Sequence, residues 1–228
     1  MPDASSRFRS SPDLALNLLQ RYENCANGGH FKGLALARRF TFITTNDNAP
    51  SGINYRQTHW LNSHVLNPLQ LKCDIQVGGH NLNYMLRTCL LGSWLLAMPD
   101  ALDILHNKNY SEHIQLYKTK QRPIMRGGNQ FHILPFPDGL SYDGMQYHND
   151  ALGQGSVVLF KPAATTPNST LIPLKGLERH RSYRLSYQER DQLNAVVSGA
   201  VLMDQGLQLK EMDGAEASEV VWIETVRR

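Results

Sequence analysis

A single acidic residue, Asp47, stands in the stretch TTNDNAPSG, directly after the segment FTFITT at residues 40–45. β-Branched and aromatic residues predict a strand over that segment, and the Asn, Pro and Gly residues that follow predict a loop. A carboxyl group on a loop after a strand can act as a general acid or base. An Asp between two Asn residues is also ordinary turn chemistry, and on local sequence alone the turn interpretation is favoured.

Cys25 and the pair Gly28-Gly29 accompany another predicted strand, the extended stretch RYENCA at residues 21–26. Small residues after a strand let a ligand approach the backbone closely. A Gly pair before a helix is also a common turn, so this stretch by itself again favours the turn interpretation.

Strands and helices are predicted to alternate as far as residue 122. Apolar spacing and good helix formers predict helices, Leu-Lys-Cys and its neighbours predict a strand, and the apolar run LRTCLLGSWLLAM predicts a buried strand that passes into a helix. The ranges are 12–20, 31–39 and 53–67 for the helices, 71–79 for the strand and 86–98 for the apolar run. This alternation is typical of parallel βα units, whose active face lies at the carboxyl ends of the strands.

From Phe131 onward the pattern changes to short strands separated by Gly and Pro, which is typical of an antiparallel β-sandwich. The predicted strands are FHILPF, MQYH, GSVVLFKP, STLIPLKGL, SYRLSYQ, AVLMDQGLQLKEM and EVVWIET. We therefore place a domain boundary near residue 126, which gives an α/β domain over 1–126 and an all-β domain over 127–228.

The composition excludes several classes of protein. In 228 residues, 41% are hydrophobic and 19% charged, which predicts a soluble globular protein, and no apolar run reaches the ~18 residues of a membrane span. The 23 basic and 20 acidic residues are spread along the chain, so nucleic acid is not an expected partner.

Three cysteines without CxxC spacing predict free thiols in a reducing compartment rather than a disulfide scaffold or a zinc site. The start MPDASSRFRSSPD has no apolar segment, so we expect a cytoplasmic protein, or a periplasmic or secreted one if its natural N-terminus lies elsewhere. His59, His64 and His80 lack ligand-like spacing, and no metal or other cofactor is expected.

The motifs are more informative together than singly. In order, ENCANGG, RRF and TTNDN resemble the ECxSGG-type and WTSDN-type motifs of α-galactosidases in glycoside hydrolase family 36, and Cys25 and Asp47 are 22 positions apart (47 − 25), close to the family spacing. Downstream, LRTCLLGSWLLAM, LYKTKQRPIMRGGNQFHILPF and GSVVLFKP match the last barrel segments and the C-terminal β-domain in order. The resemblance covers roughly residues 12–225.

The resemblance implies the second half of a (β/α)8 TIM-type barrel followed by an antiparallel β-sandwich, and retaining hydrolysis of terminal α-galactosides. Asp47 takes the general acid/base position. Cys25, Gly28 and Asn46 take substrate-binding positions, and Trp60 on the next helix is a further candidate for sugar contact. Trp94 and Trp222 lie in apolar runs and are expected in the core.

The chain also departs from the family pattern. No Lys-Trp-Asp segment, which carries the nucleophile in such enzymes, precedes Cys25. Phe31 and Gly33 stand where an Arg and an Asp are common, and His30 stands where another Gly is usual. We therefore expect a fragment or truncated relative that is inactive by itself and that pairs with a complementary half-barrel or with itself.

Two alternatives remain open. The chain could be a noncatalytic carbohydrate-binding or scaffold protein derived from such an enzyme. Alternatively, Glu23 or another local carboxylate could serve as the nucleophile in a self-complementing dimer.

Overall fold

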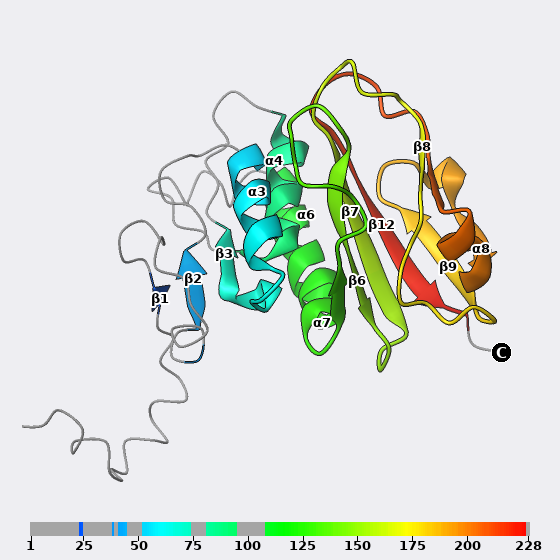
Figure 1. Ribbon diagram of the computed structural model, residues 1–228, viewed down its shortest axis with the longest axis horizontal. Helices are drawn as coiled ribbons and strands as arrows, with labels where there is room; N and C mark the ends of the chain where they lie inside the picture. Colours follow the sequence, from blue (N-terminus) through cyan, green and yellow to red (C-terminus); the bar gives the residue numbers. More distant parts are fainter. Residues whose placement is uncertain are drawn as a thin grey trace, which may run out of the picture.

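The computed structural model describes residues 23–24, 38, 41–44, 52–73, 81–94 and 108–226. Its elements form layers (Figure 1): a small parallel sheet, a layer of helices, a six-stranded antiparallel sheet, and an outer layer with two short strands and a helix. The helices predicted over 12–20 and 31–39 lie outside the described residues, apart from a turn at Arg38.

The parallel sheet has four strands in the order of the sequence, β1-β2-β3-β4, and each neighbouring pair is parallel. Its strands are β1 Glu23–Asn24, β2 Phe42–Thr44, β3 Leu71–Cys73 and β4 Ser93–Trp94. The strands predicted within 40–45 and 71–79 are thereby confirmed. Parallel neighbours need crossover connections, and helices supply them between β2 and β3 and between β3 and β4.

The helix layer begins with α3 Gly52–Asn62, which confirms a helix in the predicted range 53–67 but ends it at Asn62, before a turn. A short 3-10 helix, η3 Pro68–Gln70, leads into β3, and α4 Leu82–Thr88 with the 3-10 turn η4 Cys89–Leu91 leads into β4. The last helical stretch is continuous: α6 Lys108–Leu116, the π-helical η5 Tyr117–Gln121, and α7 Arg122–Met125.

The prediction for the apolar run at 86–98 is wrong in its order, because the helix comes first and the strand second. The Asn81 side chain caps the backbone N–H of Tyr84 at 3.2 Å and so starts α4 before the run begins. Extended backbone at Gly92 then ends the helical part and opens β4. Apolar periodicity alone does not separate a buried strand from a buried helix, which explains the error.

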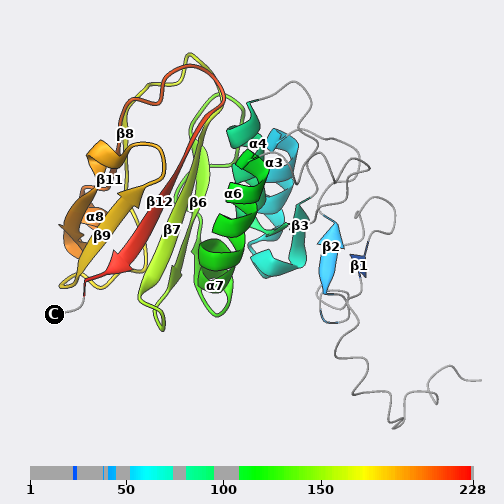
Figure 2. The same cartoon turned by 180° about the vertical axis from the view of Figure 1, so that it is seen from behind.

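The antiparallel sheet has the order β10-β9-β12-β7-β6-β5. Its strands are β5 Asn129–Phe131, β6 Asp143–Asn149, β7 Gln154–Lys161, β9 Ser182–Tyr187, β10 Ala195–Ser198 and β12 Ala217–Thr225. The outer layer consists of β8 Thr170–Ile172 paired with β11 Leu207–Leu209, together with α8 Gly199–Asp204 (Figure 2). The antiparallel character predicted for the second half of the chain is therefore confirmed.

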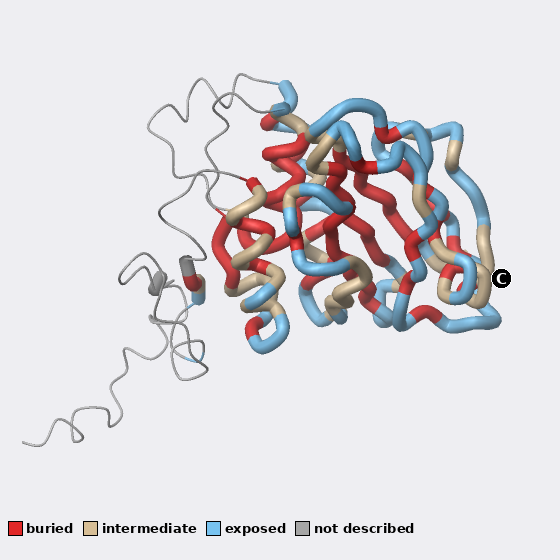
Figure 3. The backbone as a smooth tube through the Cα atoms, turned by 45° about the horizontal axis from the view of Figure 1, so that its top comes forward, coloured by how far each residue is buried: buried red, intermediate tan, exposed pale blue. Residues whose placement is uncertain are grey.

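Both faces of the antiparallel sheet are covered, which is why β7 has no polar stripe. Val158 and Phe160 pack with helix residues in one buried cluster, whereas Val157 and Leu159 pack beneath β8 and β11 in another. The backbone through these layers is mostly buried (Figure 3). Trp222 belongs to the cluster on the helix side and Trp94 packs against it, so both are core residues as predicted.

Two of the predicted strands are wrong. FHILPF forms a strand only as far as Phe131, since the chain then runs through Pro135 and Pro137, which cannot donate to a ladder. In AVLMDQGLQLKEM the first half is α8, capped by the Ser198 hydroxyl, which accepts from the N–H of Val201 at 3.3 Å. Gly206, with φ of 102°, then turns the chain into β11.

Cys73 and Cys89 are buried and form no disulfide, and Cys25 lies outside the described residues. Within the described ranges, no helix has the length and hydropathy needed to cross a bilayer.

Candidate active site

The four parallel strands end along one edge of their sheet. Asn24 pairs with Ile43, and the row from Thr44 through Lys72 to Ser93 continues the register across the sheet. Ligand sites in parallel α/β folds lie at the carboxyl ends of the strands. This edge is therefore where the chain can present catalytic groups.

The residues predicted for catalysis come directly after these strand ends in the sequence. Cys25 follows the last residue of β1, and Asn46 and Asp47 follow β2 after one intervening Thr. Cys25, Gly28, Asn46 and Asp47 lie outside the described residues, so their roles stay predictions. The structure describes the strands before them and the helix after them.

That helix, α3, is fixed tightly from its first residue. A Cβ atom on Gly52 would lie 3.0 Å from the sulfur of Met85 and 3.3 Å from Oγ1 of Thr88, so α3 and α4 approach closely at this point. Only the absence of a side chain permits this approach. The first residue of α3 is thus held against α4.

One turn later, Arg56 anchors α3 to the antiparallel sheet. Its Nε donates to Oδ1 of Asp143 at 2.6 Å and its Nη2 donates to Oδ2 at 3.1 Å. The guanidinium carbon lies 4.7 Å from the ring centre of Tyr84 and 4.3 Å from that of Phe160. Burial raises the pKa of Asp143, and the Arg56 charge offsets part of that rise.

A second buried group, Tyr55, His59 and Tyr147, ties α3 to its other neighbours. The Tyr55 hydroxyl lies 3.4 Å from Nδ1 of His59, and the Tyr147 hydroxyl lies 3.4 Å from Nε2 of the same ring. Tyr147 also donates to the carbonyl of Leu91 at 2.6 Å. Burial lowers the pKa of His59 to about 3, with His132 as a smaller cause, so this imidazole is neutral.

Trp60, the predicted sugar contact, is half-buried near the end of α3. Its Nε1 donates to the carbonyl of Leu134 at 3.5 Å, and its ring makes edge contacts with His64, His132 and Phe136. These partners include the segment after β5, so Trp60 helps join the helix layer to the antiparallel sheet. A contact with sugar stays a prediction.

A buried charged residue that the sequence pattern did not single out is Lys72, in the middle of β3. Its neighbours Leu71 and Cys73 pack in the buried clusters, and strand geometry directs the Lys72 side chain to the opposite face of the parallel sheet. Lys72 is nevertheless only 7% exposed. A Lys between two apolar strand residues is the signal that could have identified it.

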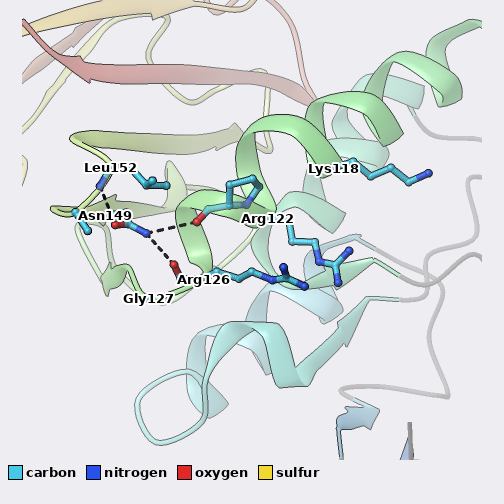
Figure 4. Close-up of a pocket in the computed structure, with 8 residues that line it drawn as sticks. Lys118, Arg122, Arg126, Gly127, Asn149 and Leu152 are labelled. Carbon is cyan, nitrogen blue, oxygen red and sulfur yellow. Dashed lines mark hydrogen bonds between the residues drawn. The ribbon is translucent and has the colours of Figure 1, made fainter. Parts of the chain in front are cut away.

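A basic pocket of about 450 Å³ lies at the other end of the helix layer (Figure 4). Lys118, Arg122 and Arg126 line it, four residues apart along one helical stretch. The two arginines also line a second pocket with residues at the starts of β2 and β4. The second pocket therefore lies at the amino ends of the parallel strands, where side chains more often serve stability than catalysis.

Among the residues with described positions, no three His, Cys, Asp or Glu side chains come together as a metal site would require.

Comparisons with known proteins agree with this architecture. The family model described as "Glycosyl hydrolase family 36 C-terminal domain" matches residues 141–223. No curated protein matches the chain. The family match begins just before β6 and ends within β12.

Several solved structures share the fold. The raffinose complex of a variant of the GH36 α-galactosidase AgaA from Geobacillus stearothermophilus has a TM-score of 0.62 at 16% identity, covering 79% of this chain and 25% of that one. AgaB from the same organism has a TM-score of 0.62 at 17% identity, with 80% and 25% covered. The α-galactosidase from Lactobacillus brevis has a TM-score of 0.60 at 14% identity, with 80% and 26% covered.

The chain thus spans about a quarter of the length of the solved structures that it matches. The resemblance expected from the ordered motifs is confirmed. Residues 141–223 match the C-terminal domain of glycosyl hydrolase family 36, and the chain shares its fold with part of the α-galactosidases of that family.

Proposed function

We propose that this chain supplies the acid/base side of an α-galactosidase active site. In this proposal β1 to β4 and their helices are the second half of a (β/α)8 barrel, and the antiparallel sheet is the β-domain that follows it. The observation that carries the proposal is the ladder of four parallel strands in sequential order, joined through one helix layer to a family 36 C-terminal domain.

Asp47 is the proposed general acid/base. It protonates the glycosidic oxygen while the bond to the sugar breaks, and as a carboxylate it then activates the water that releases the sugar. Cys25, Gly28 and Asn46 are proposed to line the sugar pocket, since they follow the carboxyl ends of β1 and β2.

A retaining mechanism also needs a carboxylate nucleophile about 5–5.5 Å from the acid/base. The proposal assigns this group to the other half of the barrel, whichever chain carries it. Terminal α-galactosides are the proposed substrates, because relatives of the same fold have been solved with raffinose and with stachyose.

The test is hydrolysis by the protein in its active assembly, with raffinose and an activated aryl α-galactoside as substrates. Asp47→Asn should lower the rate on raffinose by about 10²- to 10⁴-fold, the usual contribution of a general acid or base. The loss in the bond-breaking step should be smaller on the activated aryl substrate, whose leaving group needs little protonation.

The matched control is Asp191→Asn, at an exposed position of the 3-10 helix Asp191–Leu193 in the antiparallel domain. It should leave both rates unchanged. Normal raffinose turnover by an assembly that carries Asp47→Asn would remove Asp47 from the acid/base role. Sugar binding without any hydrolysis would instead favour the noncatalytic carbohydrate-binding alternative.

A further inference from the structure

A polar pocket of about 480 Å³ lies between the helix layer and the antiparallel sheet, and none of the residues proposed for the active site lines it. Its walls come from α4, from α6 and the π-helical η5, and from Gln188 and Glu189 just after β9. Small-molecule sites occur preferentially where two structural units meet in this way.

The lining of this pocket is rich in amide and hydroxyl side chains. Each of these groups can both donate and accept hydrogen bonds, as a sugar hydroxyl does. The amide and hydroxyl residues contributed by the helices are Asn83, Asn109, Ser111, Gln115 and Thr119.

Arg87, which lines this pocket, has one buried hydrogen-bond donor without a partner. The residue is 3% exposed; its Nη1 donates to the carbonyl of Ser218 at 2.8 Å, and its Nη2 donates to Glu189. Its Nε, in contrast, has no hydrogen-bond partner. Native proteins leave few buried polar atoms unpaired, and each one calls for an explanation.

His113, in the same lining, has a buried hydrogen-bond acceptor without a partner. Its Nδ1 lies 2.8 Å from the carbonyl of Asn109, which can only accept, so Nδ1 carries the proton and Nε2 of the neutral ring is an acceptor. Burial is the main cause that lowers the pKa of His113 and keeps the ring neutral. Nε2 is buried and has no partner, and the whole residue is 6% exposed.

The helix beside the pocket is irregular at the same place. Tyr117–Gln121 is π-helical within a continuous helical stretch, and Thr119 of this segment lines the pocket. Short π-helical segments occur frequently at functional sites. The irregularity and the two unpaired nitrogens are independent features of one location.

We propose that this pocket is a second, noncatalytic carbohydrate site that takes one neutral sugar ring. Sugar hydroxyls can donate to Nε2 of His113 and accept from Nε–H of Arg87, and this pairing of one acceptor with one donor fits an alcohol better than an anion or a cation. Glu112 and Glu189 in the lining disfavour an anion, and Arg87 disfavours a cation. Both nitrogens are buried, so the lining side chains must rearrange for the ring to reach them.

The choice of galactose as the probe rests on the proposed function, whereas the site itself does not. The experiment is titration calorimetry of the full chain carrying Asp47→Asn with galactose and raffinose, in the presence and absence of His113→Phe or Gln115→Ala. His113→Phe should weaken binding at least tenfold, because it removes the acceptor Nε2; it also removes the hydrogen bond from Nδ1–H to the carbonyl of Asn109, so the melting temperature is measured beside it. Gln115→Ala, at an exposed position, should weaken binding several-fold without affecting folding.

The matched control is Gln208→Ala, at an exposed position of β11 outside the pocket, which should bind as the parent does. No heat with either sugar at millimolar concentration, or binding that survives both pocket substitutions, would overturn this site. Loss of hydrolysis with Asp47→Asn while the pocket still binds sugar would leave this site in place. Intact hydrolysis in an assembly with Asp47→Asn would contradict the proposed function alone.

Discussion

Arg56 and Asp143 are 87 residues apart in the sequence and form a doubly hydrogen-bonded ion pair with side chains 1% and 2% exposed. The pair joins α3, which follows the segment carrying Asp47, to the first residue of β6. The helix that follows Asp47 in the sequence is therefore coupled to the antiparallel domain through one buried ion pair.

Removing one charge of this pair should be strongly destabilising. Asp143→Asn leaves the Arg56 guanidinium buried without an anion, and we expect the free energy of unfolding to fall by about 3–5 kcal/mol. Urea unfolding at pH 7, followed by circular dichroism, measures the change.

The double change Arg56→Met with Asp143→Leu removes both charges and should cost less than Asp143→Asn alone. The exposed pair of Arg179 and Asp204 supplies the control, since Asp204→Asn should leave stability nearly unchanged. If Asp143→Asn and Asp204→Asn unfolded at the same urea concentration, the buried pair would not anchor α3.

His59 should make the protein less stable in acid. The imidazole titrates near 6.5 in the unfolded chain and near 3 when folded, so between these values only the unfolded chain binds the proton. The free energy of unfolding should therefore fall as the pH drops from about 6.5 toward 3, by at most ~1.4 kcal/mol per pH unit from this group.

His59→Phe should flatten this slope, and urea unfolding at a series of pH values measures it. His180→Phe, at a side chain that is 79% exposed, should leave the slope as it is. A slope in His59→Phe equal to that of the parent would show that other groups cause the acid sensitivity.

Asn149 should be required in its amide form. Its Nδ2 donates to the carbonyl of Arg126 at 2.8 Å, and its Oδ1 accepts from the N–H of Leu152 at 3.2 Å, so it joins the end of α7 to the turn after β6 (Figure 4). Asn149→Ala should lower the free energy of unfolding by about 1–3 kcal/mol.

Asn149→Asp should lower the free energy of unfolding more than Asn149→Ala does at pH 7, because it places a carboxylate oxygen against carbonyl oxygens. The loss of stability of Asn149→Asp relative to the parent should become smaller as the pH falls, since the protonated carboxyl group can donate a hydrogen bond again. Unfolding curves at pH 7 and at pH 4 provide the comparison. A loss of stability that stays constant with pH would contradict the role of the Asn149 side chain as a hydrogen-bond donor.

Trp60 should contribute to stability through its packing. Trp60→Ala removes the edge contacts with His132 and Phe136, and we expect a loss of about 2 kcal/mol, below the value for a fully buried Trp. Chemical denaturation measures this loss. Trp60→Phe keeps part of the packing, and a raised KM at unchanged stability would assign Trp60 to sugar contact instead.

Local sequence patterns were sufficient to predict several of the strands. β-Branched and aromatic runs predicted β2, β7 and β12, and the ordered motifs predicted the relation to family 36 that the match over 141–223 confirms. Periodicity was insufficient in the apolar run at 86–98, because every described residue of it except Trp94 is buried and so neither period stands out.

For the candidate sites, the sequence by itself determined which residues follow the parallel strands, and the ordered motifs that resemble family 36 identified Asp47 as the proposed acid/base. Only the tertiary structure decided how the following helix α3 is held, through Arg56 and Asp143, and where Arg87 and His113 leave unpaired nitrogens beside one pocket. The reason is physical: strand and helix periods are encoded locally, whereas a buried charge pair or a pocket depends on side chains that only folding brings together.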